Sequence, residues 1–177
     1  IAANLRFLTP GEFVREALNA NQMESATSIF SADILRWRLF SVLSDRSRWQ
    51  HPAMQTIAPY LRGAQSEMKA WSLAGECAAA FEKYQAWRRD WCLAWDRGDA
   101  PLDWQAHLWR EVTQGKKHRG QAIADYLAAF ESRESGLPLG LPKRLFVFAC
   151  LNVSPDVLRV IATAAKTGPL HFYLPSP

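Results

Sequence analysis

The chain has 177 residues, of which 49% are apolar, 12% are aromatic and 21% are charged, and its formal net charge is +4. This apolar fraction excludes a globally disordered chain and is enough for one packed domain or two small ones. The small positive charge permits contact with nucleic acid without demanding it, and no apolar run approaches the roughly 20 residues that a membrane-spanning helix needs.

The three cysteines, Cys77, Cys92 and Cys150, form no CxxC pair, and the four histidines form no zinc-ligand pattern with them. We therefore expect buried, reduced thiols in a cytoplasmic protein, with no metal site and no cofactor. The chain begins at Ile1 without a recognisable signal peptide, and we expect it to be a fragment of a longer protein.

The first twenty residues predict a short strand and then a helix. Residues 4–8, NLRFL, alternate apolar and polar side chains, as a half-buried strand does. Thr9 and Glu12 have the spacing of a capping box, and Pro10 stands at the first helical position. We therefore predict a helix that begins directly after Thr9.

A long block of helical patterns follows. We predict one helix that begins after Ser31 and four further helices over residues 52–62, 64–96, 103–113 and 119–132. The longest should end near Gly98 and Pro101, because both residue types interrupt helices. Residues 135–142, SGLPLGLP, predict a linker.

The pattern changes in the last part of the chain. Residues 144–151, RLFVFACL, form a continuous apolar run, which is typical of a strand covered on both faces. Ser154 and Pro155 mark a helix start, and residues 170–174 predict a second strand. A strand, a helix and a strand within about thirty residues predict a right-handed βαβ unit.

These patterns together predict a mostly helical α/β protein. A partial parallel sheet is interrupted by a large all-helical insertion. We expect the α/β part to comprise residues 1–20 and 140–177, and the insertion to comprise residues 21–139.

A βαβ unit raises the question of nucleotide binding, but the motifs for it are missing. The chain contains neither GxxxxGK[ST] nor GxGxxG, and it has no GxSxG nucleophile motif. No acidic residue lies between Glu134 and Asp156, so the strand at 144–151 offers no carboxylate for a magnesium ion. Asp156 falls in the first turn of a predicted helix, where interaction with the helix N-terminus is the simpler role. We therefore predict no catalytic residue.

Trp87, Trp91 and Trp95 are spaced i, i+4, i+8, so they share one face of the predicted helix. We favour packing of this stripe into the helical block, where each ring can bury about 150–250 Å². Stacking on nucleic-acid bases is the alternative, and it requires exposed rings.

The densest basic run precedes a predicted helix and consists of Lys116, Lys117, His118 and Arg119. A solvated turn is the ordinary explanation of such a run. Its place before a helix N-terminus, where backbone N–H groups favour anions, also permits contact with a phosphate.

Five longer phrases are specific rather than generic. They are IAANLRFLTPGEF at 1–13, FEKYQAWRRDWCLAWDRG at 81–98, WQAHLWREV at 104–112, GLPKRLFVFACLNVSPDVL at 140–158 and HFYLPSP at 171–177. The whole chain resembles the RecC family, the gamma subunits of exodeoxyribonuclease V. These five stretches carry the resemblance, because they occur in the same order and with similar spacing.

The resemblance implies part of a superfamily 1 helicase-like domain that has lost its ATPase, with a 1A-like α/β part and a 1B-like helical insertion. In active helicases the strand before this helix ends in an Asp-Glu pair. Registration on Pro155 puts Phe148 and Ala149 at that pair, and Leu174 and Pro175 where active helicases have Gly-Asp. The implied fragment is therefore inactive within an ATP-dependent helicase and nuclease.

The resemblance also implies a function in double-strand break repair and recombination. Such a module holds and scans the 3′-ended single strand of DNA in the channel where the Chi sequence is recognised, together with RecB-like and RecD-like subunits, in the bacterial cytoplasm at the nucleoid. A helical domain that docks those subunits with little DNA contact is the alternative. A DNA channel should gather its basic residues on one concave face.

The predicted DNA-contacting residues match the family's contact surface or belong to the basic run, and they are Thr9, Arg15, Glu82, Arg88, Lys116, Lys117 and Arg119. Three positions depart from the enteric members of the family, which carry Leu, Trp and Asp where this chain has Thr9, Arg15 and Ala79. The resemblance therefore does not extend to recognition of the same Chi octamer.

Overall fold

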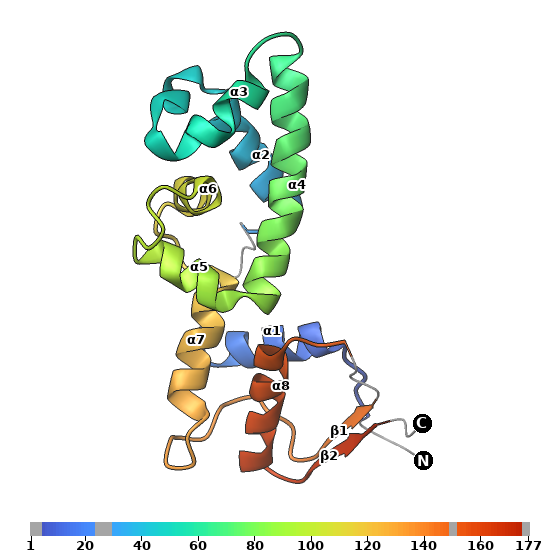
Figure 1. Cartoon of the computed structure of the whole chain (residues 1–177). Helices are drawn as coiled ribbons and strands as arrows, with labels where there is room; N and C mark the ends of the chain where they lie inside the picture. The colour runs from blue at the N-terminus through green and yellow to red at the C-terminus, as the bar shows by residue number, and fades with distance from the viewer. Residues whose placement is uncertain (1–4, 24–29, 149–151, 175–177) are drawn as a thin grey trace. The chain divides into compact units, whose positions relative to one another are not determined.

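The computed structural model describes residues 5–23, 30–148 and 152–174 of the chain (Figure 1). Two compact units divide it: an α/β unit of residues 1–26 and 122–177, and a helical unit of residues 27–121. The second boundary falls inside a helix, so residues 122–139 belong with the α/β unit and the helical unit is smaller than the predicted insertion. The predicted fold class, a mostly helical α/β protein with a small parallel sheet, is confirmed.

The α/β unit is built on a two-stranded parallel sheet. Its elements are α1 (Pro10–Ala20), the later part of α7 (Arg119–Phe130), β1 (Leu145–Phe148), α8 (Pro155–Ala162), a 3-10 turn (Thr163–Lys166) and β2 (Leu170–Tyr173). In the sheet Leu145 pairs with Leu170 and Phe148 pairs with Tyr173. The predicted strand, helix and parallel strand are therefore confirmed, and α1 packs against α8.

Two strand predictions are wrong in part. Residues 5–8 form no strand and are exposed. The Arg6 side chain donates instead to the Glu16 carboxylate of α1 at 2.8 Å. Asn4 lies outside the described residues. The strand at 144–151 is not covered on both faces, since Val147 alone of β1 is buried. Residues 149–151 lie outside the described residues.

The outer face of the sheet carries a ladder of aromatic rings. Phe146 stacks on His171 with ring centres 5.2 Å apart, and Phe148 stacks on Tyr173 with ring centres 4.8 Å apart. These four side chains are exposed, and Val147 points to the opposite, core face because side chains alternate along a strand.

The helix starts of the α/β unit follow the predicted caps. Thr9 Oγ1 accepts a hydrogen bond from the Glu12 backbone N–H at 3.3 Å, and the Thr9 backbone N–H donates to the Glu12 carboxylate at 2.7 Å. The bond that the Thr9 backbone N–H donates to the Glu12 carboxylate, together with one that the Thr9 hydroxyl donates to it at 2.8 Å, holds the pKa of Glu12 below its usual value. Ser154 stands at the N-cap of α8, but its buried hydroxyl forms no hydrogen bond to any described residue.

The helical unit consists of short helices around one long one. Its elements are α2 (Ala32–Ser44), two 3-10 turns (Arg46–Gln50 and Pro52–Thr56), α3 (Ala58–Leu61), α4 (Ser66–Trp87), α5 (Arg89–Asp96), α6 (Trp104–Thr113) and the first turn of α7. Within this unit α2 packs along α4, and α6 packs against α2 and α5 (Figure 1). No helix in the described part of the chain is both long and apolar enough to cross a membrane.

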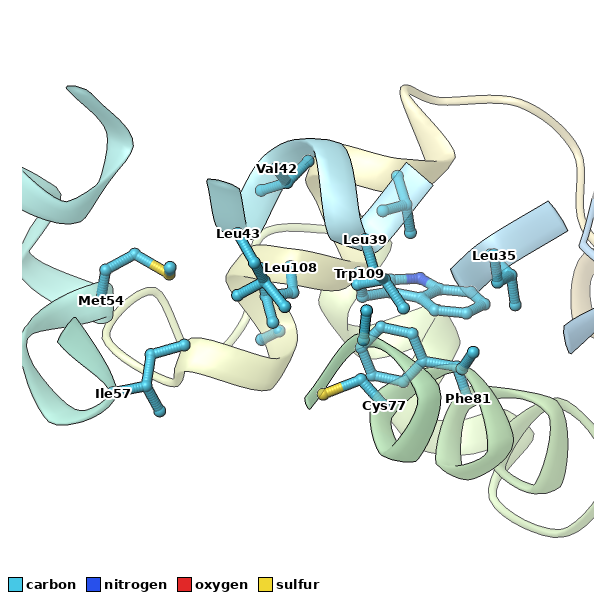
Figure 2. Packing of buried hydrophobic residues seen from close by; sticks show 14 of the residues in the cluster. Leu35, Leu39, Val42, Leu43, Met54, Ile57, Cys77, Phe81, Leu108 and Trp109 are labelled. Atoms are coloured by element: carbon cyan, nitrogen blue, oxygen red, sulfur yellow. The ribbon is translucent and has the colours of Figure 1, made fainter. Parts of the chain in front are cut away.

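Trp109 of α6 occupies the core of this unit. Its ring meets the ring of Phe81 edge to face, with centres 5.3 Å apart, and lies among Leu35 and Leu39 of α2 (Figure 2). Cys77 belongs to the same core, and burial raises the pKa of its thiol to about 12.

Burial also raises the pKa of the Cys92 thiol to about 12, again in this core. Both thiols therefore stay protonated at neutral pH, as buried structural cysteines do. The prediction of buried thiols is confirmed for these two residues, and Cys150 lies outside the described residues.

The predicted helix over residues 64–96 is divided at Arg88, whose backbone angles of φ −131° and ψ 46° are not helical. The end of α5 is as predicted, since Gly98 adopts φ +92°, which favours glycine. The predicted helix over residues 52–62 is a 3-10 turn followed by one helical turn. Pro59 accounts for this break, because proline lacks the N–H that a continuous helix requires.

The two N-caps of the α/β unit allow a matched test of the capping bond. We expect Thr9→Ala to lower the free energy of unfolding by about 1 kcal/mol, because it leaves the first-turn N–H without a partner. Ser154→Ala should be neutral or stabilising, since it removes a buried hydroxyl without a partner. Urea unfolding followed by far-UV circular dichroism measures both, and equal losses would contradict the assignment.

His107 gives the helical unit an acid-sensitive core. It is buried, and its ring stacks on His51 with centres 3.9 Å apart. Burial, together with the charges of His51, Arg110 and Arg48, lowers the pKa of His107 to about 4. The folded protein therefore keeps this ring neutral at pH values where the unfolded chain, with a pKa of about 6.5, takes up a proton.

We expect the free energy of unfolding to fall by about 2–3 kcal/mol through this residue as the pH drops from 6.5 towards 4. His107→Phe should flatten this part of the profile, because it keeps a ring and removes the titration. Urea unfolding monitored by tryptophan fluorescence reports the helical unit, since every tryptophan lies between residues 37 and 109. His171→Phe, in the other unit, is the control and should leave that profile unchanged.

Candidate nucleic-acid interface

The predicted DNA-contacting residues fall in both units. Thr9 and Arg15 belong to the α/β unit, where Thr9 uses its hydroxyl in the capping box and Arg15 is exposed on α1. Glu82 is exposed on α4. The remaining four residues lie in the helical unit, near the starts of α5 and α7, and are Arg88, Lys116, Lys117 and Arg119.

Arg88 lies at the joint between α4 and α5. Its Nε and Nη2 atoms donate to the two carboxylate oxygens of Asp90 at 3.3 and 3.2 Å. Its guanidinium carbon lies 3.6 Å from the centre of the Trp91 ring. The hydrogen bond from Arg88 holds the pKa of Asp90 below its usual value.

The tryptophans divide between core and surface. Trp95 and Trp109 are buried at 7% and 0% exposure, which confirms the packing interpretation for them. Trp87 and Trp91 remain 49% and 38% exposed, so packing accounts for these two only in part; Trp91 contacts Tyr84 and Trp95 with its covered side. The i, i+4, i+8 spacing no longer defines one face, because the helix is interrupted at Arg88.

His118 differs from its basic neighbours. Its side chain is fully buried, and its Nε2 lies 2.7 Å from the carboxylate of Asp96. The backbone N–H of Gly120 donates to His118 Nδ1 at 3.1 Å, so the proton of a neutral ring belongs on Nε2, which donates to Asp96. The ring also meets Trp109 edge to face at 4.9 Å. The prediction that His118 belongs to a solvated basic run is wrong.

The Asp96 carboxylate connects three segments of the helical unit through hydrogen bonds. Besides His118, its carboxylate accepts hydrogen bonds from Trp109 Nε1 at 2.9 Å and from Gln121 Nε2 at 3.0 Å. The end of α5, the middle of α6 and the first turn of α7 are thereby joined. Sequence reasoning missed Asp96, and no motif signals it, because its partners lie 13 to 25 residues away along the chain.

The exposed members of the basic run surround this buried centre. Lys116 and Lys117 are exposed, on a turn in which Gln114 and Gly115 have φ of +49° and +70°. Arg119 is half-buried at the first position of α7, and its side chain forms no ion pair with any other residue that the structure describes.

The starts of α5 and α7 are neighbours. A Cβ added to Gly120 would lie 3.2 Å from Arg89 Cγ. The backbone segments that carry Arg88 and Arg119 therefore adjoin within the helical unit. In the described residues, no group of three or more His, Cys, Asp and Glu side chains is arranged to hold a metal ion.

Comparison with known proteins identifies similar sequences over the whole chain. The family model described as "RecC, N-terminal domain" matches residues 1–177. The chain is 24% identical to the RecBCD enzyme subunit RecC of Escherichia coli strain K12, over 100% of this chain and 17% of that protein. It is 21% identical to the RecBCD enzyme subunit RecC of Haemophilus influenzae, over 100% of this chain and 18% of that protein. The chain thus spans under a fifth of these relatives.

Gly120 and Gly11 allow a matched test of the Asp96 centre, since each stands at the second position of a helix. A Cβ on Gly120 would lie 2.9 Å from His118 Cε1, whereas a Cβ on Gly11 meets nothing within 4 Å. We expect Gly120→Ala to cost roughly 1–3 kcal/mol through this overlap. Gly11→Ala should be neutral or stabilise by up to about 1 kcal/mol.

Urea unfolding followed by far-UV circular dichroism measures both variants. Tryptophan fluorescence should change in Gly120→Ala alone, because Trp109 contacts His118 and the α/β unit has no tryptophan. A Gly120→Ala variant as stable as Gly11→Ala would contradict the close packing of His118 against α7.

Proposed function

The chain belongs to the RecC family, whose N-terminal domain it matches over residues 1–177, and from this premise we propose that it is a non-catalytic module that holds single-stranded DNA. The module works in a RecBCD-type helicase and nuclease of the bacterial cytoplasm. Its strand is the 3′-ended one, scanned for a Chi-like sequence during double-strand break repair and recombination. RecB-like and RecD-like subunits are its protein partners. The α/β unit corresponds to the 1A-like part of a helicase domain, and the helical unit corresponds to the 1B-like insertion.

The observation that carries the proposal is the gathering of basic residues around the start of α7. Arg119 stands at the first position of this helix, where backbone N–H groups and the helix dipole favour a phosphate. Lys116 and Lys117 are exposed on the turn before it. Asp96, whose side chain lies beneath this turn, is turned inward and already accepts three hydrogen bonds.

The ion pair formed by the first acidic residue after β1 supports a non-catalytic role. Asp156, the first acid after β1, accepts a hydrogen bond from Arg159 at 3.1 Å, and Arg159 also donates to Glu131 at 2.6 Å. A carboxylate engaged in such a network on a helix has a structural role. The protonated thiols of Cys77 and Cys92 likewise supply no nucleophile.

Docking of partner subunits is the second candidate function, and an aromatic cluster on α2 and α4 favours it. The exposed ring of Trp37 lies 4.7 Å from that of Trp71, and Phe40 meets Trp71 edge to face at 5.3 Å. The Arg36 guanidinium carbon lies 3.9 Å from the centre of the Trp71 ring. Tryptophan and arginine are enriched at the centres of protein interfaces.

Binding of a labelled single-stranded oligonucleotide, measured by fluorescence anisotropy over a series of salt concentrations, tests the proposal. Each phosphate contact contributes about 0.7 to the slope of log affinity against log salt on a single strand. We therefore expect Lys116→Gln/Arg119→Gln to weaken binding and to reduce this slope by roughly 1.4.

Arg46→Gln/Arg62→Gln is the matched control, because it removes the same charge from exposed positions of the same unit. It should leave the slope nearly unchanged. An equal effect of both pairs would mean that net charge alone attracts the strand. A wild-type chain that does not bind at low salt would reject the proposal, and loss of subunit capture in Trp37→Ala would then support docking.

A further inference from the structure

We infer that Arg88 binds an unpaired base through the flat face of its guanidinium, stacked on Trp91, rather than holding a phosphate through its N–H groups. The inference rests on the proposed function, since it concerns the same single strand. It assigns a contact type to Arg88 and adds Trp91 to the binding surface.

One of the two hydrogen-bonding edges of the Arg88 guanidinium, the Nε/Nη2 edge, is already occupied. Nε and Nη2 form the edge with which arginine commonly grips a phosphate in a fork, and both donate to Asp90. The carboxylate also offsets the charge of the guanidinium. A phosphate approaching this edge would have to displace Asp90, which lies two positions along the chain and is 68% exposed.

One face of the Arg88 guanidinium packs on the Trp91 ring. The guanidinium carbon lies 3.6 Å from the centre of the Trp91 ring, which is the separation of stacked planar groups. Trp91 is supported in turn by Tyr84 at 5.4 Å and by Trp95 at 6.3 Å, and Trp95 belongs to the core. The stack therefore continues from the core to the surface.

The joint between α4 and α5 fixes this geometry in the backbone. The Arg88 N–H donates to the Tyr84 carbonyl at 2.8 Å, and the Trp91 N–H donates to the Arg88 carbonyl at 3.0 Å. Arg88 thus ends one helix and starts the next, with Trp91 in the turn directly above it.

The joint also presents flat, accessible surface. The Arg88 side chain is 44% exposed, and the neighbouring Trp87 is an exposed second indole. Single-stranded bases stack on aromatic rings and on guanidinium planes, and they do so with little dependence on sequence. A base is therefore the group that this surface fits.

Replacing Arg88 by lysine separates the two contact types, because lysine keeps the charge and loses the plane. Anisotropy titrations of the wild-type chain, Arg88→Lys and Arg88→Gln would use a labelled oligothymidine and a matched strand with abasic positions. We expect both variants to lose roughly five- to hundredfold in affinity for oligothymidine, with the salt slope unchanged. On the abasic strand, the variants and the wild type should bind alike.

Trp91→Ala should reproduce the loss, and Trp91→Phe should restore part of it. Circular dichroism of each variant confirms that the fold is retained, and Lys116→Gln shows in the same titrations how a lost phosphate contact lowers the slope. Rescue by Arg88→Lys, with a slope lowered by about 0.7 in Arg88→Gln, would overturn the inference in favour of a phosphate contact. Unchanged binding in all variants would overturn it as well. Both results leave the proposed function standing, whereas a wild-type chain that fails to bind either strand overturns that function too.

Discussion

Three hydrogen bonds converge on the carboxylate of Asp96, and the arrangement of the helical unit depends on them. They come from Trp109, His118 and Gln121 at 2.7 to 3.0 Å, so the end of α5, the middle of α6 and the first turn of α7 meet at one carboxylate that is largely withdrawn from water. Such a charge is tolerated when its lone pairs are matched, and losing one partner is costly. The turn that carries Lys116 and Lys117 is therefore anchored by this buried carboxylate and its partners.

Much of the helical architecture was predictable because helix starts are local. Thr9, Glu12 and Pro10 contain the whole signal for α1, and Gly98 contains the signal for the end of α5. The division of the long helix at Arg88 was not predictable in this way. No glycine or proline lies in the sequence WRRDW to mark the break, and the helix after it places Trp95 in the core.

Sequence alone also gave an incomplete account of the candidate nucleic-acid interface. Charge and position along the chain identify Lys116 and Arg119 as surface cations, but they do not separate His118 from them. That separation depends on Asp96, which lies 22 residues earlier in the sequence. In the same way, the apolar run around Val147 predicts a strand correctly. It does not predict which faces are covered, because that depends on elements packed from elsewhere in the fold.

The joint at Arg88 bears on how this surface can diverge among relatives. A single-residue deletion there would join α4 and α5 into one helix and turn every later side chain by about 100° around the helix axis. Trp95 would leave the core, and the segment leading to Asp96 would lose its register. Substitutions at the exposed positions carry no such penalty. Exposed side chains at the joint can thus be replaced without disturbing the fold, while the length of the segment is fixed, and aligned relatives should show gaps on either side of it but not within it.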